Sequence, residues 1–441
     1  MRKITKFLAC SILLCIPLIV FSSQINEVNN STKSDLSLIP RSILFQQQTK
    51  RAITLSPNGR FLAYVGPDED GKSYLWIKEL FATIDPQKVI PYQHADGIRK
   101  ILWQFDNKHL LIASDQNMNM NVHLYQIEIG TGKIRDLTPI NDVFTQIIAY
   151  YPKNPQKIIV RLVPMNPNEE EKKNWTPPGL HQINLDTAEM IPYAENPGNV
   201  VHWGIDQNLN IICNLSVIDD QIQINVKDHY TWRPLITKSM DGNIGDLTTP
   251  FMGFSKNKEL FLLSNLDNDA SRLLKVNLDS GSYKIVAEDP QYDLSPTVIF
   301  SHNDSKILFS GAIREKFEHI VIEKDFEGDL KTLKDHYPGI VKILETDLSS
   351  RIWLVLHESD VEPPSYFAYN CTTQHSELLF KENQKINDYK LCNTQPISFT
   401  AQDGMKIYGY LTLPAIEAKN LPAVILVHGG PWGRDRWNIT P

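Results

Sequence analysis

The sequence predicts a mainly β protein, a seven-bladed β-propeller followed by the first strands of an α/β domain. Three observations indicate this fold class. A strand–turn–strand pattern recurs between residues 51 and 392, the pattern then stops, and a hairpin and an apolar run complete the sequence. About seven repeats of roughly 45 to 50 residues, each with enough strand for a four-stranded blade, are typical of propellers. A β-repeat protein of another kind is the alternative.

The repeat is clearest in four segments, residues 54–80, 101–139, 252–286 and 298–333. The first of them contains a Pro-Asn-Gly turn, the β-type run FLAYV, a polar turn and a second β-type run, YLWIKEL. Apolar runs bounded by Asn, Asp and Gly are hairpin signals. Weaker copies begin at Thr145, Val201 and Val341. Residues 51–392 are therefore predicted to form one seven-bladed propeller.

Residues 1–23 have the composition of a secretory signal peptide. Three basic residues precede the apolar run Phe7–Phe21, which is short for a membrane span. The sequence therefore predicts export to the periplasm or the medium, and an uncleaved membrane anchor is the alternative. Residues 24–50 are predicted to form an N-terminal arm, whose apolar patch at residues 36–45 favours a short helix or a docked segment.

Composition excludes several classes of partner. The chain has 441 residues, enough for two or three domains, and a formal net charge of -7. An acidic protein lacks the basic surface that phosphate binding needs, so nucleic acid is not expected as a partner. The histidines and cysteines show no metal-ligand spacing, and neither metal nor cofactor is predicted. Outside the signal, three cysteines make no disulfide framework, although Cys371 and Cys392 could pair in an oxidising compartment.

One formal motif match is rejected from its context. Residues 66–73, GPDEDGKS, satisfy the P-loop pattern letter for letter. A P-loop must open a helix whose N-terminal N–H groups meet phosphate, whereas β-type sequence follows here. The three acidic residues in the motif would also repel phosphate. We therefore expect an ordinary hairpin turn and no bound nucleotide.

The last fifty residues change character. Residues 396–414 give a strand, an Asp-Gly turn and a second strand. Six of the seven residues from Leu421 to Val427 are Leu, Ala, Val or Ile, and such a run predicts a strand covered on both faces. Two antiparallel strands that lead into a buried strand are how an α/β-hydrolase sheet begins. Residues 393–441 are therefore predicted to be the start of such a domain, incomplete in this sequence.

A glycine turn follows the apolar run. Gly429, Gly430 and Pro431 let the backbone approach a ligand closely and direct free N–H groups at it, as an oxyanion hole requires. An ordinary exit from a strand into a loop is the alternative interpretation.

Four features together resemble the prolyl oligopeptidase family of serine peptidases, and in particular its acylaminoacyl-peptidase and dipeptidyl-aminopeptidase-like branch. They are LIPRSILF followed by TLSPNGRFLAYV, the seven repeats, the hairpin QDGMKIYGYLTLP and the stretch VHGGPWGRDRW. The resemblance implies a propeller that caps a hydrolase domain and admits short peptides. The implied reaction is amide hydrolysis through an acyl-enzyme.

The resemblance also assigns site residues. It places a group of four beside the oxyanion hole, with the N–H of Gly430 as first donor and that of Gly429 as second: His428, Gly429, Gly430 and Pro431. A second group matches the family pattern and is interpreted as shaping the turn: Trp432, Arg434, Asp435 and Trp437.

The sequence departs from the family in one respect. The nucleophile elbow G-x-S-x-G should follow, with Asp and then His after it, but the pattern does not occur in these 441 residues. No catalytic residue is therefore assigned, because the triad is absent and His428 has no serine partner. We expect a chain that stops early in its hydrolase domain and is inactive alone. An exported propeller that binds proteins, with a vestigial hydrolase segment, is the alternative function.

Overall fold

The computed structural model describes residues 38–46, 49–90, 95–115, 118–165, 178–229, 231–239, 251–301, 305–414, 419–430 and 433–438. The predicted signal peptide and the N-terminal arm as far as residue 37 lie outside the described residues. None of the described helices is long and apolar enough to cross a membrane.

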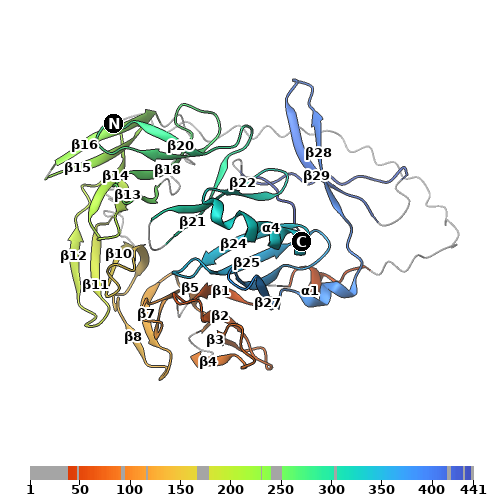
Figure 1. Ribbon diagram of the computed structural model, residues 1–441, viewed down its shortest axis with the longest axis horizontal. Coiled ribbons are helices and arrows are strands. Elements are labelled where there is room, and N and C mark those ends of the chain that lie inside the picture. Colours follow the sequence, from red (N-terminus) through yellow and green to blue (C-terminus); the bar gives the residue numbers. More distant parts are fainter. Residues whose placement is uncertain are drawn as a thin grey trace. The chain divides into compact units, whose positions relative to one another are not determined.

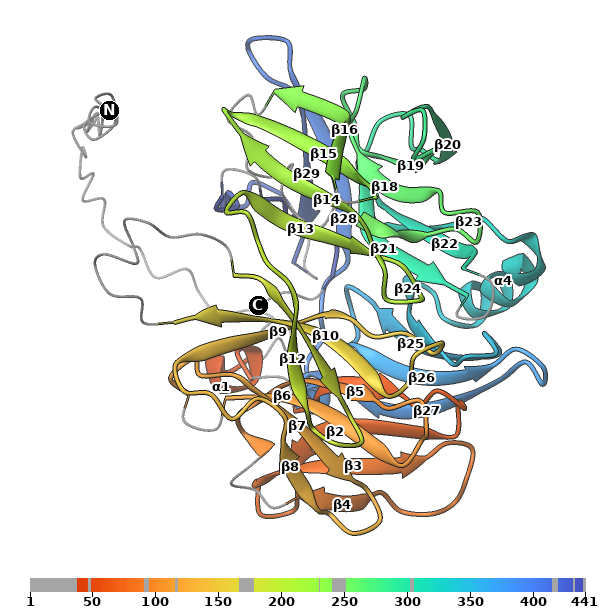
Figure 2. The same cartoon turned by 90° about the vertical axis from the view of Figure 1, so that its left-hand side faces the viewer.

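The strands confirm a seven-bladed β-propeller, in which each blade is an antiparallel meander and the blades follow one another in chain order (Figures 1 and 2). The first four blades are β1 (Arg51–Leu55), β2 (Phe61–Pro67), β3 (Ser73–Glu79) and β4 (Gln87–Ile90); β5 (Ile98–Trp103), β6 (His109–Ser114), β7 (His123–Glu128) and β8 (Ile134–Asp136); β9 (Val143–Ala149), β10 (Lys157–Pro164), β11 (Leu180–Asn184) and β12 (Met190–Ala194); and β13 (Val200–Ile205), β14 (Ile211–Ile218), β15 (Gln221–Asp228) and β16 (Thr231–Ser239).

The last three blades differ in strand number, because the sixth has three strands where the others have four. They are β17 (Phe251–Phe254), β18 (Leu260–Ser264), β19 (Arg272–Val276) and β20 (Tyr283–Ala287); β21 (Leu294–Phe300), β22 (Ile307–Ile313) and β23 (Phe317–Val321); and β24 (Ile340–Thr346), β25 (Ile352–Glu358), β26 (Ser365–Asn370) and β27 (His375–Lys381).

The P-loop-like residues form the turn between β2 and β3. The N–H of Asp68 donates to the carbonyl of Lys72 at 2.9 Å, and one Asp68 carboxylate oxygen accepts from the N–H groups of Asp70 and Lys72. The segment therefore joins two paired strands and does not open a helix. This agrees with the hairpin predicted from its sequence context.

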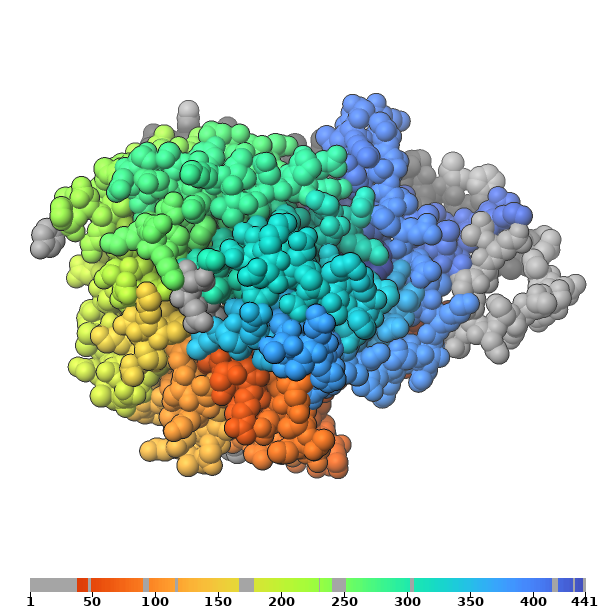
Figure 3. Space-filling model, in the orientation of Figure 1, coloured from red at the N-terminus to blue at the C-terminus, as the bar shows by residue number. Residues whose placement is uncertain are grey.

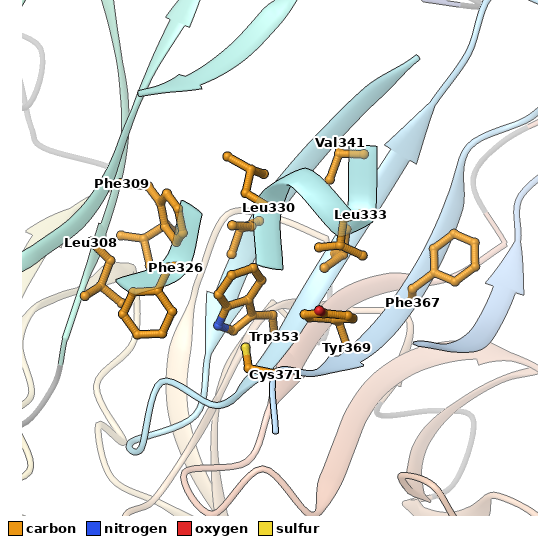
Figure 4. Close-up of a cluster of buried hydrophobic side chains, with 13 residues drawn as sticks. Leu308, Phe309, Phe326, Leu330, Leu333, Val341, Trp353, Phe367, Tyr369 and Cys371 are labelled. Atoms are coloured by element: carbon orange, nitrogen blue, oxygen red, sulfur yellow. The ribbon is translucent and has the colours of Figure 1, made fainter. Parts of the chain in front are cut away.

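Blade six contains an element that the repeat did not predict. Residues 298–333 were expected to form an ordinary strand unit, but β23 is followed by a short 3-10 turn, η2 (Lys324–Phe326), and by the helix α4 (Glu327–His336). Leu330 and Leu333 of α4 lie over Trp353 and Tyr369 of blade seven (Figure 4). Residues three apart share one helix face, so this face can cover the apolar surface of the next blade.

The joint between blades one and seven closes the series of blades. Leu55 and Leu62 of blade one pack with Leu354 and Phe380 of blade seven in one apolar cluster. At the same joint the carboxylate of Glu345 accepts the N–H of Leu55 at 2.8 Å and the hydroxyl of Thr54 at 3.1 Å. Burial raises the pKa of Glu345 to about 7.

A short helix lies beside this joint, as the apolar patch at residues 36–45 suggested. It is α1 (Arg41–Leu44). The side-chain amide of Asn383, which precedes the 3-10 turn η3 (Gln384–Asp388), donates to the carbonyl of Ile43 at 2.8 Å. Nearby, the carboxylate of Glu382 accepts the N–H of Thr49 at 2.9 Å.

The predicted hairpin is present, as β28 (Thr394–Thr400) and β29 (Lys406–Thr412). Gly404 at its turn has a φ of 86°, a conformation that favours glycine. Among the strands that the structure describes, these two pair only with each other, and their tip stands out from the blades in Figures 1 and 3.

The prediction of a buried strand at Leu421–Val427 is wrong for this structure. The segment forms no strand, and the side chains from Val424 to Val427 are between 78% and 95% exposed. The physical reason is that a strand needs a neighbour for its N–H and C=O groups. No strand among the described residues lies beside this run.

None of the described cysteines is paired. Cys371 and Cys392 are both free thiols, and Cys371 lies in the apolar cluster around Trp353. Burial there raises the pKa of the Cys371 thiol, which keeps it in the unreactive protonated form.

A buried histidine connects blades six and seven. The ring nitrogen Nε2 of His319, on β23, accepts the N–H of Ile343, on β24, at 2.8 Å. The ring also packs edge-on against Phe317, with 4.9 Å between the centroids. Burial lowers the pKa of His319 to about 4.

His319 predicts that the stability of this joint depends on pH. An unfolded histidine titrates near pH 6.5, so as the pH falls the unfolded chain takes up the proton first. We expect this group to lower the free energy of unfolding by up to about 3 kcal/mol between about pH 7 and pH 4, and to have no effect above that range. Urea unfolding of the wild type and of His319→Gln across this range measures the difference. A variant curve that falls as steeply as the wild type's would contradict the assignment.

Candidate functional site

The glycine turn is exposed and held by few contacts. His428, Gly429 and Gly430 are all exposed, and Nδ1 of His428 lies 2.9 Å from the carbonyl of Gly429. Gly430 has a φ of 152°, which side-chain-bearing residues rarely adopt. Among the described residues, no acceptor takes the N–H groups of Gly429 and Gly430. Pro431 and Trp432 lie outside the described residues.

Gly433 lies against the glycine turn. A Cβ atom on Gly433 would lie 2.4 Å from the carbonyl oxygen of Gly429 and 3.2 Å from Nδ1 of His428. Only glycine permits an approach this close. The backbone of Gly433 therefore packs directly on the glycine turn.

Arg434 attaches the segment to blade six. Its guanidinium donates to the carbonyl of Ile313 at 2.6 Å and to the carbonyl of Arg314 at 2.9 Å. Ile313 is the last residue of β22, and Arg314 begins the connection to β23; we name residues 313–316 the blade-six turn. The rigid guanidinium fork matches two successive carbonyls better than a single ammonium could. The Arg434 side chain also lies 6.0 Å from the centroid of the Tyr292 ring.

Trp437 makes a second attachment. It is 4% exposed and packs in an apolar cluster with Phe317 and Ile340. Its indole N–H donates to the carbonyl of Thr394 at 2.7 Å. The ammonium of Lys316, in the blade-six turn, lies 3.5 Å from the centroid of the indole ring, a cation–π geometry.

The hairpin β28–β29 reaches the same surface. The hydroxyl of Tyr410 donates to the carbonyl of Glu315 at 2.5 Å, and the N–H of Thr394 donates to the carboxylate of Asp360 at 2.7 Å. Every residue of the blade-six turn is thus contacted by residues 394–437. Asp435, by contrast, is exposed, and its carbonyl lies 3.5 Å from Nε of Arg434.

A cavity of about 500 Å³ opens beside the docked segment. Its walls come from the end of α4, from blade seven and from the hairpin base, and they include Lys316, Tyr337, His357, Asp360, Lys381 and Trp437. Side chains of both charge signs therefore face one space together with aromatic rings. A smaller cavity of about 90 Å³ shares Lys316 and Trp437 with it. No cluster of metal-ligating side chains occurs in the part of the chain that the structure describes.

The structure brings together residues that the sequence could not connect. His428, Gly429 and Gly430 were predicted as one turn and do lie together. The partners of Arg434 and Trp437 in the blade-six turn were not predicted, because residues 313–316 look like any other hairpin connection. Ile313 and Arg314 accept through their backbone carbonyls, and a backbone carbonyl is the same whatever the residue type.

The fold and the docked segment define a protein of the β-propeller class whose last strands lie outside the blades. No family model matches the chain. It is 24% identical over 418 residues to dipeptidyl aminopeptidase BIII of Pseudoxanthomonas mexicana, a match that covers 91% of this chain and 58% of the relative.

Two solved structures share the fold. A puromycin-hydrolysing peptidase of Mycobacterium tuberculosis superposes with a TM-score of 0.60 and 11% identity, covering 90% of this chain and 64% of that one. A prolyl endopeptidase superposes with a TM-score of 0.56 and 13% identity, covering 84% and 55%. These two likenesses show that the chain shares its propeller fold with these peptidases. The chain spans 58% of the length of the curated relative that it matches.

We expect the contacts of Trp437 to stabilise residues 394–438 and not the propeller. Replacing Trp437 by Ala removes a buried indole and its hydrogen bond to Thr394, a loss of about 3 kcal/mol or more. We expect limited proteolysis to cut residues 394–438 much faster in the variant, while the thermal unfolding of the propeller changes little. Even in the wild type this segment should be cut first, since its exposed strands lack neighbours. Cleavage within the blades before the segment would contradict this order.

Proposed function

We propose that the chain is the propeller-bearing part of a serine-type peptidase that hydrolyses short peptides through an acyl-enzyme. The observation that carries the proposal is the glycine turn His428–Gly430, held against a family propeller with its N–H groups uncommitted. Such N–H groups can stabilise the negative oxygen of a tetrahedral intermediate. The similarity to a dipeptidyl aminopeptidase over most of the chain supports the same activity.

The residues take distinct parts in this proposal. The N–H of Gly430 is the first oxyanion donor and that of Gly429 the second. The nucleophile, its base and the orienting carboxylate come from sequence outside these 441 residues, because no G-x-S-x-G occurs within them. That sequence would belong to an α/β-hydrolase part that begins with β28 and β29 and covers the apolar run Leu421–Val427. Alone, the chain is inactive, since oxyanion donors without a nucleophile have no intermediate to stabilise.

The cavity beside Trp437 supports a peptide substrate. Peptides carry amides, apolar side chains and charged ends, and the cavity offers aromatic rings beside Asp360, Lys316 and Lys381. Its volume, about 500 Å³, suits a few residues and not a folded protein. The proposed signal peptide would place this reaction outside the cytoplasm, in the periplasm or the medium.

The proposed activity can be tested with a serine-directed probe. Antibodies raised against the recombinant chain are used to capture the native protein from the source cells and from their medium. Both the captured material and the recombinant chain are treated with a fluorescent fluorophosphonate and assayed with dipeptidyl and acyl-aminoacyl reporter substrates. We expect no labelling and no turnover with the recombinant chain, and both with the captured protein.

The position of the label distinguishes the arrangements. A label on the captured polypeptide itself, or on a second polypeptide that accompanies it, supports the peptidase. Captured protein that neither labels nor turns over any substrate would exclude it and leave the protein-binding propeller as the explanation. Labelling of the 441-residue chain would show that it carries its own nucleophile, contrary to the proposal. Heat-denatured captured protein is the control for non-specific labelling.

A further inference from the structure

We infer that the blade-six turn positions the glycine turn, with Arg434 and Trp437 as the positioning residues that transmit the constraint. In this arrangement the propeller itself fixes the direction of the Gly429 and Gly430 N–H groups. The inference rests on the proposed function, because it explains how the proposed oxyanion donors are held. Its structural content can nevertheless be tested on the chain alone.

The first step is the distance along the chain. Arg434 follows Gly430 by only four positions in the chain, and four residues span at most about 14 Å. The guanidinium of Arg434 is held by the two successive carbonyls of Ile313 and Arg314. Two hydrogen bonds from one rigid fork fix the orientation of the group as well as its place. The region that Gly430 can occupy is therefore limited by blade six.

The second step is the direction of the chain. Trp437 follows Arg434 by three residues and is buried against Phe317 and beneath the ammonium of Lys316. One anchor alone would let the segment pivot. Arg434 and Trp437 both contact the blade-six turn. With both ends attached, the backbone between these two residues cannot rotate about either one.

The third step links the anchored backbone to the glycine turn. Gly433 directly precedes Arg434 and lies so close to Gly429 that any Cβ would collide with the Gly429 carbonyl. A Cβ on Gly429 itself would meet nothing within 4 Å. The glycine turn thus packs against Gly433 on one side and faces open space on the other. Displacing the anchor must displace the turn.

The blade-six turn is itself braced from within the propeller. The guanidinium Nε of Arg314 donates to the carboxylate of Asp289 at 2.6 Å, and the Asp289 side chain is 1% exposed. The same carboxylate accepts the N–H groups of Gln291 and Tyr292. An ion pair whose acid is buried and fully hydrogen-bonded resists displacement. The constraint therefore runs from the interior of the propeller through Arg314 and Arg434 to the glycine turn.

A spin label on the glycine turn of the 441-residue chain tests the inference. Gly429→Cys can carry the label, because a Cβ there meets nothing within 4 Å, and Cys392→Ser removes the described cysteine that is not buried. In this background Arg434→Ala should shorten the rotational correlation time of the label about threefold, since the loss of two hydrogen bonds frees the segment. The thermal unfolding midpoint should not change. Arg434→Lys should give an intermediate value, because an ammonium can donate to these carbonyls without the fork.

Arg436→Ala is the matched control. Arg436 is the same residue type two positions along and is exposed, and among the described residues its side chain has no hydrogen bond to the blade-six turn. In the same labelled background, its variant should leave the mobility of the label unchanged.

Two results would overturn the inference. Either Arg434→Ala leaves the mobility of the label unchanged, or it also lowers the unfolding midpoint, as the loss of a merely structural residue would. The result is separable from the proposed function. If the label responds as expected but the captured native protein shows no fluorophosphonate labelling, the peptidase proposal fails and the positioning of the glycine turn stands.

Discussion

The structure depends on the need of each blade to have its apolar faces covered by its neighbours. A four-stranded sheet with two apolar faces is not stable alone in water. Stacking the next blade against the sheet buries one of its apolar faces. The clusters formed by neighbouring blades show this contact repeated along the chain. Because every blade needs two neighbours, the series has to close, and Leu55 and Leu354 meet at the joint where it does.

Closure at this joint relies on side chains, because each blade is made of consecutive strands. Among the described strands, none from the end of the propeller pairs with the first blade. Hydrogen bonds supplement the apolar contacts. The carboxylate of Glu345 accepts hydrogen bonds from Thr54 and Leu55, and the carboxylate of Glu382 accepts one from Thr49. A carboxylate with a pKa of about 7 at such a position will change charge within the ordinary pH range of cells.

Local sequence signals gave the blades, and non-local contacts decided the rest. The turn at Asn58-Gly59, the β-type run of β2 and the Asp403-Gly404 hairpin could all be predicted, since each depends on a few adjacent residues. The helix α4 could not, because Leu330 and Leu333 gain their partners only from Trp353 and Tyr369 of the next blade. The run Leu421–Val427 was predicted as a buried strand from composition, but composition does not supply the strand beside it. The contact of Arg434 with carbonyls about 120 residues earlier has no counterpart in sequence spacing.

The exposed run Val424–Val427 has a consequence for how the chain behaves in a cell. Four consecutive aliphatic residues without a charge, in an extended segment, have the composition of a cross-β core. Such a segment can be covered by a strand of its own domain or by the same segment of another molecule. The two outcomes depend differently on concentration, because pairing between molecules becomes faster as the chain accumulates. The amount of soluble protein that a cell can hold therefore depends on how rapidly a strand of the same molecule covers these four side chains.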